Sequence, residues 1–321
     1  MVDENRDFNK TPKIKVIGVG GAGNNAVNTM IEDNVRGVTF YNLNTEIGSL
    51  KKSRTNNIIQ IGANVTNGLG AGANENIGEK AAIESRDEIK NILQGTDLLF
   101  ITAGMGGGTG TGAAPVIANI AKEMGILTIG VVSKPFLFEG KQRRARAEYG
   151  TQNLKQYVDD LIVILNDNLL KLKDKKITFK NAFSMADNIL EQGITSITDL
   201  LRTTGDVNID FADIKTIMNY RGRAYMGIGI ASGEQKIEEA VKQAIDSSLT
   251  ETKINGAKGI IVNIKGNEKL SLMEVSNAIT ILNDKICDDA NIIFGTVTDN
   301  NLEDAVMVTV IATGIDEDAV K

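Results

Sequence analysis

The sequence predicts an α/β fold in which a parallel sheet, covered by helices on both faces, is joined by a long helix to a smaller α/β unit. Three observations support this prediction. Strand-like apolar runs alternate with helical patterns in the N-terminal half, and glycine-rich loops follow several of the runs. Residues 179–202 form one long amphipathic helical pattern. A shorter set of strand-like runs and two helical patterns follows it.

Four apolar runs in the N-terminal half are typical of strands, and they cover residues 13–19, 38–44, 97–103 and 127–132. A helical pattern at residues 113–124 separates the last two. The runs are nearly continuous in apolar character, as in strands that are buried on both faces of a parallel sheet. We therefore expect a Rossmann-like domain over residues 12–178.

Residues 179–203 are predicted to form a central connecting helix. Its apolar residues repeat at spacings of three and four, at positions 183, 186, 190, 194, 197 and 201. A second domain is expected over residues 204–316, with strands at 225–231, 259–264, 291–297 and 306–312. Ser271 and Glu274 form a capping-box pattern before one of its helices. Residues 1–11 and 317–321 are expected to be flexible.

The composition excludes several kinds of chemistry. The chain has no histidine and a single cysteine, Cys287, so zinc sites built on histidine or paired cysteines and Ser-His-Asp catalysis are excluded. A formal net charge of −6 argues against nucleic acid as a partner. No apolar run approaches the ~18 residues of a membrane span, so no direct membrane contact is expected. Catalysis would have to use carboxylates, Lys, Arg, backbone amides or a ligand-held metal ion.

The loop from Gly104 to Gly112 (GMGGGTGTG) is predicted to bind phosphate groups. It lies between a buried strand and a helix, and a helix N-terminus offers unpaired amides and roughly +0.5 of a charge. Glycines let the backbone approach an anion closely, and Thr109 and Thr111 add hydroxyl groups. The alternative is a flexible turn without a ligand. No lysine follows the glycines, so this is not a GxxxxGK[ST] loop, and backbone amides would hold the phosphates.

Two further glycine loops are expected at the same edge of the sheet. Residues 18–23 satisfy GxGxxG, which also allows an NAD-dependent oxidoreductase. That alternative is disfavoured because the next predicted strand ends in Asn42-Leu43-Asn44 and not in the acid that would hold a ribose. Residues 68–74 (GLGAGAN) form the third loop. Three such loops at the carboxyl edge of one parallel sheet would surround a polyphosphate.

These motifs carry a family resemblance. GMGGGTGTG closely resembles the tubulin signature loop of FtsZ, the bacterial cell-division GTPase related to tubulin. Further segments resemble the same family in the same order: GVGGAGNN, GAGAN, KPFLFEGKQRR, AFSMADNILEQG, NIDFADIKTIM, MGIG and ANIIFGTV. The resemblance covers about residues 12–315 and implies the tubulin/FtsZ fold, with a GTP-binding domain, a central helix and a C-terminal assembly domain that activates the GTPase.

The resemblance implies a set of nucleotide-binding residues. The phosphate contacts would be Gly20, Gly21, Ala22, Asn25, Ala71, Gly72, Ala73, Asn74, Gly104, Gly106, Gly107, Gly108, Thr109 and Gly110. Glu139 and Arg143 would hold the ribose, and Asn166, Phe183 and Asp187 would surround the base. A carboxylate such as Asp187 accepts from the two N–H groups of guanine, which adenine lacks as a pair. On spacing alone, Phe183 could equally be a core residue and Asp187 a solvated helix charge.

Asn208, Asp210 and Asp213 are the expected catalytic residues. They follow the long helix, which rises ~30 Å over about 20 residues from the expected base site. The two aspartates could instead serve as helix caps. In proteins resembling FtsZ, subunits stack head to tail, so these acids would complete the nucleotide site of the next subunit and position the attacking water. Mg²⁺ would be held mainly by the GTP phosphates and not by a site of the protein's own. The alternative is a nucleotide-binding filament protein with little hydrolysis.

The resemblance also implies partners and a location. The chain itself would be the main partner, as a head-to-tail homopolymer in the cytoplasm at the mid-cell division site. Other division-ring proteins are expected, but the chain ends at Lys321, where the family usually continues to a tail peptide, so no tail-mediated partner is inferred. The sequence departs from the family pattern at Glu46, Glu75, Ser196 and Asp206.

Overall fold

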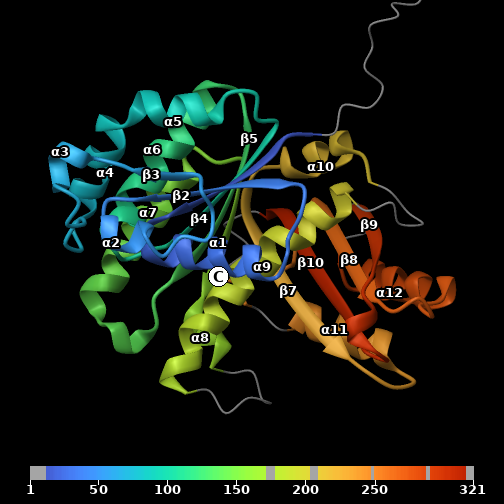
Figure 1. The fold of residues 1–321 in the computed structure, drawn as a ribbon. Helices are drawn as coiled ribbons and strands as arrows, with labels where there is room; N and C mark the ends of the chain where they lie inside the picture. The colour runs from blue at the N-terminus through green and yellow to red at the C-terminus, as the bar shows by residue number, and fades with distance from the viewer. Residues whose placement is uncertain (1–11, 171–177, 203–208, 247–248, 287–289, 316–321) are drawn as a thin grey trace, which may run out of the picture.

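The computed structural model describes residues 12–170, 178–202, 209–246, 249–286 and 290–315. All its strands belong to one ten-stranded sheet with the order β3-β2-β1-β4-β5-β6-β7-β10-β8-β9 (Figure 1). The strands are β1 (Ile14–Val19), β2 (Val38–Asn44), β3 (Ile58–Gln60), β4 (Leu98–Gly104), β5 (Leu127–Lys134), β6 (Asp160–Leu165), β7 (Gly222–Ala231), β8 (Gly259–Gly266), β9 (Asn291–Thr298) and β10 (Val306–Ile315).

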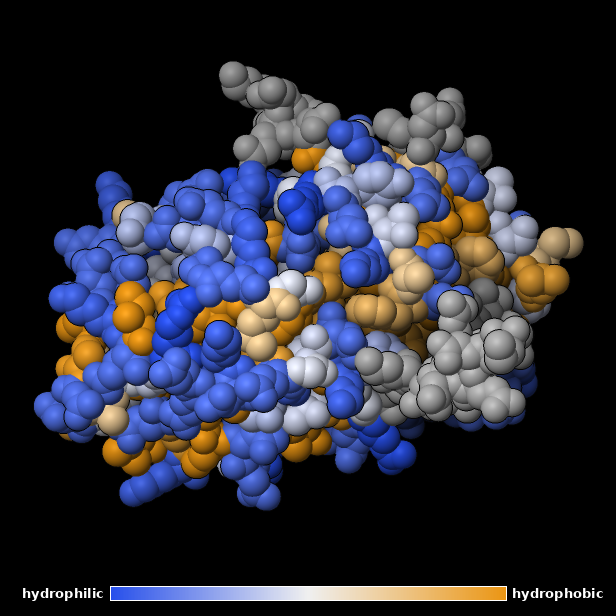
Figure 2. All heavy atoms as spheres, turned by 90° about the horizontal axis from the view of Figure 1, so that it is seen from above, coloured by the Kyte–Doolittle hydropathy of each residue, from blue (hydrophilic) through white to orange (hydrophobic). Residues whose placement is uncertain are grey.

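The helices cover both faces of the sheet. They are α1 (Gly20–Glu32), α2 (Ile47–Leu50), α3 (Ala63–Thr66), α4 (Glu75–Glu84), α5 (Arg86–Leu93), α6 (Thr109–Glu123), η1 (Leu137–Glu139), α7 (Lys141–Lys155), α8 (Asn166–Leu169), α9 (Phe179–Arg202), α10 (Phe211–Met218), α11 (Lys236–Asp246), α12 (Leu272–Lys285) and η2 (Asn300–Leu302). None of those that the structure describes is long and apolar enough to span a bilayer. The face seen from above is mostly hydrophilic, with hydrophobic residues in separate strips (Figure 2).

The N-terminal part of the sheet, from β3 to β6, is entirely parallel, as the continuous apolar runs predict. Its two faces bury separate cores. Buried residues of α4, α5, α6 and α7 pack on one face, and those of α1, α9 and α10 pack on the other. Two strands were not among those predicted: β3, which has only three residues, and β6, whose run DLIVIL is as apolar as the runs of the predicted strands.

The C-terminal part of the sheet is mixed. β10 pairs antiparallel with β7 and β8, and β8 pairs parallel with β9. The parallel pairing of Asp160–Ile162 in β6 with Gly222–Ala224 in β7 makes the two parts one continuous sheet. A Cβ atom added to Gly229 would lie 1.9 Å from the carbonyl oxygen of Ala240, so this glycine lets α11 lie directly on β7. Residues from β7, β8, β10, α11 and α12 form the third large core.

Helix α9 crosses the molecule between the two parts. It has 24 residues, which corresponds to a length of about 36 Å. Figure 1 shows it running from the end where α8 lies to the end where α10 lies. Most of the predicted apolar face is buried, with Leu190, Ile194 and Ile197 fully inside the core, whereas Phe183 at its start is exposed. The helix therefore connects the carboxyl edge of the parallel sheet to the loop that precedes α10.

Asp160, the first residue of β6, is a buried acid at the junction of the two parts of the sheet. Its side chain is 1% exposed, and neither carboxylate oxygen has a hydrogen-bond partner in the described part of the chain. Burial raises the pKa of Asp160 well above its usual value, and the neighbouring Asp159 carboxylate raises it further, against the opposing effect of Arg221. The ionised form is therefore unfavourable in the folded protein.

We predict that Asp160→Asn stabilises the protein in a pH-dependent way. The folded pKa of Asp160 lies above its unfolded value, so wild type loses free energy of unfolding as the pH rises above about 4, the ordinary pKa of the group. The variant lacks this loss, so its advantage should grow from acidic to neutral pH. Urea unfolding of both proteins over this range measures the difference. A difference that is constant with pH would contradict the assignment.

Candidate nucleotide-binding site

Three glycine loops lie at the carboxyl ends of parallel strands, and each leads into a helix. β1 ends at Val19 and α1 begins at Gly20. β4 ends at Gly104 and α6 begins at Thr109. The loop 68–74 follows β3 and α3, and Asn74 caps α4 by accepting a hydrogen bond from the amide of Asn76 at 3.0 Å. Three helix N-termini therefore face the same edge of the sheet.

The three loops pack against one another so closely that side chains would not fit between them. A Cβ atom added to Gly104 would lie 2.6 Å from the Cβ of Ala22, in the loop of residues 18–23. One added to Gly108 would lie 2.7 Å from the Cβ of Ala71 and 2.9 Å from the amide nitrogen of Asn74. The predicted phosphate-binding segments are thus brought together by direct contact.

The contact also connects the first loop to α6. A Cβ atom added to Gly20 would lie 3.0 Å from the amide nitrogen of Gly110, and Gly20 has a left-handed φ of 73°. By contrast, Cβ atoms added to Gly21, Gly72 and Gly107 would meet nothing within 4 Å. Unpaired amides at helix N-termini next to open backbone are the groups that bind phosphate. The arrangement therefore suits a polyphosphate chain.

One amide of the long glycine loop is used within the loop itself. The N–H of Gly106 donates to the hydroxyl oxygen of Thr111 at 2.8 Å, and Thr111 is buried. This bond, together with the left-handed φ of 97° at Gly106, fixes the path of the loop. The Thr111 hydroxyl, which was predicted to serve a bound phosphate, supports the loop instead.

Thr45 is a supporting residue that was not predicted from the sequence. Its hydroxyl lies 2.7 Å from the hydroxyl of Thr109 at the start of α6. Its carbonyl oxygen accepts hydrogen bonds from the Thr66 hydroxyl at 3.2 Å and the Gly70 amide at 3.3 Å. Thr45 is fully buried. Through these hydrogen bonds it connects the end of β2 to the glycine loop of residues 104–112 and to the loop of residues 68–74. In the sequence, the feature that could have indicated this role is the position of Thr45 directly after the predicted strand of residues 38–44.

A short asparagine chain holds the first loop. The side-chain amide of Asn24 donates to the carbonyl of Gly18 at 2.8 Å, and its oxygen accepts from the Asn44 side chain at 2.9 Å. Both asparagines are buried. Asn25, the predicted phosphate contact, is the exposed neighbour, as are Gly21 and Ala22. The buried Asn24 thus supports the loop, whereas Asn25 faces solvent.

The predicted ribose residues lie beside the long glycine loop. A Cβ atom added to Gly106 would lie 2.5 Å from the carbonyl oxygen of Arg143, and the Arg146 side chain donates to the Gly106 carbonyl at 3.1 Å. Arg143 forms an ion pair with Glu139 at 3.1 Å. The Glu139 side chain is only 8% exposed and accepts a hydrogen bond from the amide of Phe136 at 2.8 Å. Glu139 is thus fixed, and Arg143 is half-exposed.

An aromatic cluster continues the site from η1 to α9. The Phe136 and Phe138 rings stack with centroids 5.0 Å apart, and the Phe183 ring lies edge-on to Phe136 at 5.6 Å. Phe136 is fully buried with Ala182 and Ala186, whereas Phe138 and Phe183 are exposed. Phe183 is thus not simply a core residue, because its ring packs against the buried Phe136 and is also exposed at the surface.

Two polar groups beside this cluster lack internal partners. The side-chain oxygen of Asn166 is buried without a hydrogen bond in the described part of the chain. Burial raises the pKa of Asp187 to about 7, and no other group contributes to that shift. A half-buried carboxylate without a charged partner is not a solvated helix charge. Both groups are suited to receive hydrogen bonds from a planar polar ligand.

Asp210 and Asp213 lie apart from these loops, at the start of α10. Asp210 occupies the N-cap position, but its side chain makes no capping hydrogen bond, and Asp213 is in the first turn. Both carboxylates are exposed. Figure 1 shows α10 at the far end of α9 from α8. Asn208, the third predicted catalytic residue, and Asp206 lie outside the described residues.

The other departures from the family pattern are accommodated locally. Glu46 occupies the N-cap position of α2 without a capping hydrogen bond, and its carboxylate accepts a hydrogen bond from the Ser49 hydroxyl at 2.9 Å. Glu75 is the first residue of α4, where a negative charge is favourable. Ser196 is buried, and its hydroxyl donates to the carbonyl of Gln192 at 2.6 Å within α9.

Comparison with known proteins places this geometry among nucleotide-binding folds. Residues 13–174 match the GTPase domain of the Tubulin/FtsZ family, and residues 222–316 match the FtsZ family C-terminal domain. A dimeric, empty FtsZ from M. jannaschii superposes with a TM-score of 0.92 and 40% identity, over 96% of this chain and 89% of that one. A point mutant of FtsZ from the same organism gives a TM-score of 0.91 and 41% identity, over 95% and 92%.

More distant structures share the fold. CetZ1 from Haloferax volcanii, a GDP-bound monomer, superposes with a TM-score of 0.79 at 21% identity, over 95% of each chain. These likenesses confirm the predicted fold class, an α/β arrangement with a parallel sheet and a long central helix.

We predict unequal effects on stability for two neighbouring alanine substitutions. Gly108→Ala should lower the free energy of unfolding by about 1–3 kcal/mol, because its Cβ overlaps the third loop. Gly107→Ala should change stability by less than about 0.5 kcal/mol, because its Cβ meets no atom of the chain. Thermal unfolding without nucleotide measures both, and equal losses would contradict the packing described.

Proposed function

This chain belongs to the tubulin/FtsZ family, and we propose that it binds GTP in the three glycine loops and hydrolyses it when subunits stack head to tail. The catalytic acids would come from the neighbouring subunit. The observation that carries the proposal is the mutual contact of the three loops, each at the N-terminus of a helix. Such an arrangement stabilises several adjacent phosphate charges without a lysine.

The preference for guanine is supported by Asn166 and Asp187. An unpaired carboxylate is an acceptor for both the N1 and N2 hydrogens of guanine, while adenine offers no such pair of donors. Phe183 lies four residues before Asp187, on the same side of α9, and its ring is available for stacking. Glu139 would accept from ribose hydroxyls, and the proposal is supported by a carboxylate that Arg143 and the Phe136 amide hold in place.

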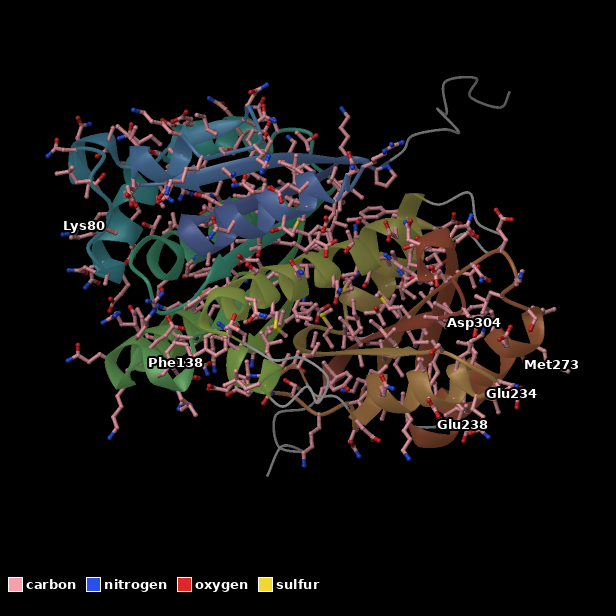
Figure 3. All side chains as sticks on the ribbon, turned by 60° about the horizontal axis from the view of Figure 1, so that its bottom comes forward. Lys80, Phe138, Glu234, Glu238, Met273 and Asp304 are labelled. Atoms are coloured by element: carbon pink, nitrogen blue, oxygen red, sulfur yellow. The ribbon has the colours of Figure 1, made fainter. Side chains whose placement is uncertain are left out.

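Head-to-tail stacking is supported by exposed apolar residues at two opposite ends of the molecule. Phe138, beside the base site, is 55% exposed. Leu272 and Met273, at the start of α12, are 84% and 73% exposed. Figure 3 shows Phe138 and Met273 at opposite ends. Surfaces at opposite ends that contact each other in successive copies produce an open filament and not a closed dimer.

In such a filament, the exposed carboxylates of Asp210 and Asp213 would face the nucleotide of the adjacent subunit and orient the attacking water. Asn208 would act beside them. The family implies Mg²⁺, which supplies charge neutralisation at the phosphates. Its ligands would be phosphate oxygens and water, since the described residues bring no three side chains of His, Cys, Asp or Glu together. The cellular role would be the division ring at mid-cell, with the filament as its scaffold.

We predict that Asp187→Asn changes base specificity. The Asn amide offers a donor where the carboxylate accepts, so GTP binding should weaken by about tenfold or more, and XTP, whose xanthine has a carbonyl at C2, should gain relative to GTP. Competition against a fluorescent GDP measures the ratio. An unchanged GTP-to-XTP ratio would show that Asp187 does not contact the base.

The same residue predicts a pH dependence of GTP binding. The raised pKa of Asp187, about 7, means that its carboxylate is mostly protonated at pH 6 and mostly ionised at pH 8. Because guanine needs the ionised form, wild type should bind about tenfold more weakly at pH 6. Asp187→Asn is the control, since it keeps the titration of the phosphates and loses that of residue 187. Parallel profiles for both proteins would refute the assignment.

We predict that Asp210→Ala leaves GTP affinity within about twofold of wild type but lowers phosphate release by about 100-fold or more. Glu88→Ala, which removes an exposed first-turn carboxylate from α5, is the control and should do neither. Wild-type turnover per subunit should rise with protein concentration. Turnover that is independent of concentration would contradict a shared site, and assembly without phosphate release would indicate a filament protein with little hydrolysis.

A further inference from the structure

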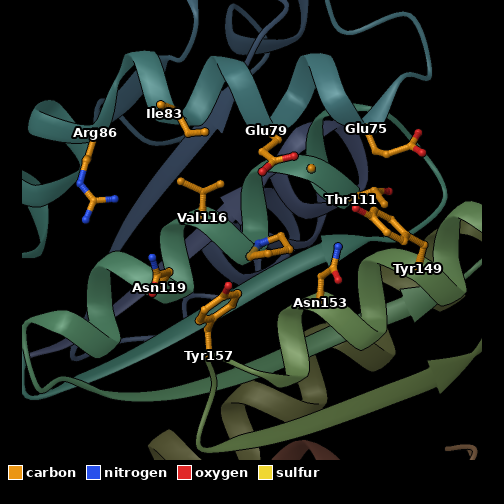
Figure 4. Close-up of a pocket in the computed structure, with 12 residues that line it drawn as sticks. Glu75, Glu79, Ile83, Arg86, Thr111, Val116, Asn119, Tyr149, Asn153 and Tyr157 are labelled. Carbon is orange, nitrogen blue, oxygen red and sulfur yellow. The ribbon is translucent and has the colours of Figure 1, made fainter.

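The nucleotide domain has a cavity between α4, α6 and α7. Its volume is about 290 Å³ (Figure 4). Three rows of side chains at four-residue spacing line it: Glu75, Glu79 and Ile83; Thr111, Pro115 and Asn119; and Tyr149, Asn153 and Tyr157. Positions four apart on a helix face the same side, about 6 Å apart along the axis. The cavity is therefore elongated along the helices.

One end of this cavity carries uncompensated negative charge. In the part of the chain that the structure describes, Glu75 and Glu79 form neither an ion pair nor a side-chain hydrogen bond. The one cationic side chain in the lining, Arg86, is paired with Glu123 of α6. Figure 4 shows both glutamates projecting from α4 on the side that faces α6 and α7. An anionic ligand is therefore disfavoured, and a cation is favoured.

The rest of the lining suits an organic cation better than a metal ion. The Tyr149 ring is half-exposed and stands across the cavity from the glutamates, so its face is available to an ammonium group (Figure 4). Pro115, Val116 and Ile83 provide an apolar surface beside the charged end. No three metal-ligating side chains come together among the described residues. An alkyl chain with several amino groups matches all these surfaces.

The spacing indicates the shape of the ligand. Glu75 and Glu79 are one helical turn apart, about 6 Å, which is close to the distance that a short alkyl chain sets between the nitrogens of a linear polyamine. The Tyr157 end is already occupied by a cation of the chain, since Lys122 lies 5.8 Å from the centre of that ring. The positive groups of a ligand would therefore gather at the Glu75–Glu79 end.

We propose that this cavity is a binding site for a linear aliphatic polyamine, with its ammonium groups on Glu75, Glu79 and the Tyr149 ring and its methylene groups on Pro115 and Val116. The site is distinct from the nucleotide loops but adjoins them. Glu75 begins α4 directly after Asn74, and Thr111 and Gly112 belong to the first turn of α6. The α4 and α6 backbones touch there, since a Cβ atom added to Gly112 would lie 2.0 Å from the carbonyl oxygen of Glu75.

The test is the binding of spermidine to the GDP-loaded protein by equilibrium dialysis at physiological ionic strength. Wild type should bind one spermidine per chain in a saturable way. Glu75→Gln together with Glu79→Gln should weaken binding by about tenfold or more. Glu234→Gln with Glu238→Gln is the matched control, because it changes the net charge equally, includes one first-turn glutamate and lies at the other end of the molecule (Figure 3). The control should bind within about twofold of wild type.

A second variant keeps the charge and removes the ring. Tyr149→Leu should weaken spermidine binding about threefold to tenfold through the loss of the cation–π contact. Butylamine, a monoamine with a similar chain, should compete poorly. Equal loss of binding in the two glutamine double variants, or binding that does not saturate, would show only a diffuse ion atmosphere and overturn the proposal. Full binding by the Glu75/Glu79 variant would do the same.

Discussion

The close approach of three backbone loops is the constraint on which the rest of the structure depends. At Gly104 and Gly108 a single added methyl group would overlap a neighbouring loop, and at Gly20 it would make a tight contact with Gly110. The space between these loops therefore leaves no room for a side chain at Gly104 or Gly108, and it is filled by backbone and by the Cβ atoms of Ala22 and Ala71. Because each loop also begins a helix, the same packing gathers three sets of unpaired amides at one edge of the sheet. A chain without histidine and without a lysine in its glycine loop thus still acquires a place for a polyphosphate.

The supporting contacts explain how the loops hold this arrangement. Thr45 joins the end of β2 to Thr109 of the long glycine loop and to Thr66, which precedes the loop of residues 68–74. Within the long glycine loop, the Thr111 hydroxyl accepts a hydrogen bond from the Gly106 amide. Arg143 and Glu139 extend the contact from the long glycine loop to the aromatic cluster at the start of α9. Helix α9 then carries the connection across the molecule to Asp210 and Asp213. The distance between the acids and the loops is therefore a property of the fold, and the proposed stacking of copies would bring them together.

Much of this could be predicted from sequence. The parallel strands are continuous apolar runs, α9 has a clear helical period, and the glycine loops follow strands, so the fold class and the gathering of the loops were accessible. Strand β3 could not be predicted, because three residues are too few to show a periodic pattern. Strand β6 was missed although its run is apolar, because no glycine loop follows it. The supporting roles of Thr45 and Thr111 depend on which way a hydroxyl points, and sequence does not encode that locally. The buried, unpartnered Asp160 likewise depends on contacts between β5, β6 and β7.

The central claim, that one subunit supplies the phosphate site and its neighbour the acids, is tested most directly by mixing two inactive variants. Gly107→Asp places a negative charge where the backbone is open, so it should abolish GTP binding and leave the fold intact. Asp210→Ala with Asp213→Ala should bind GTP without hydrolysing it. The account predicts that a mixture of the two regains phosphate release, because intact loops of one variant meet intact acids of the other. A mixture that releases no more phosphate than the two variants do separately, while still co-assembling, would contradict it.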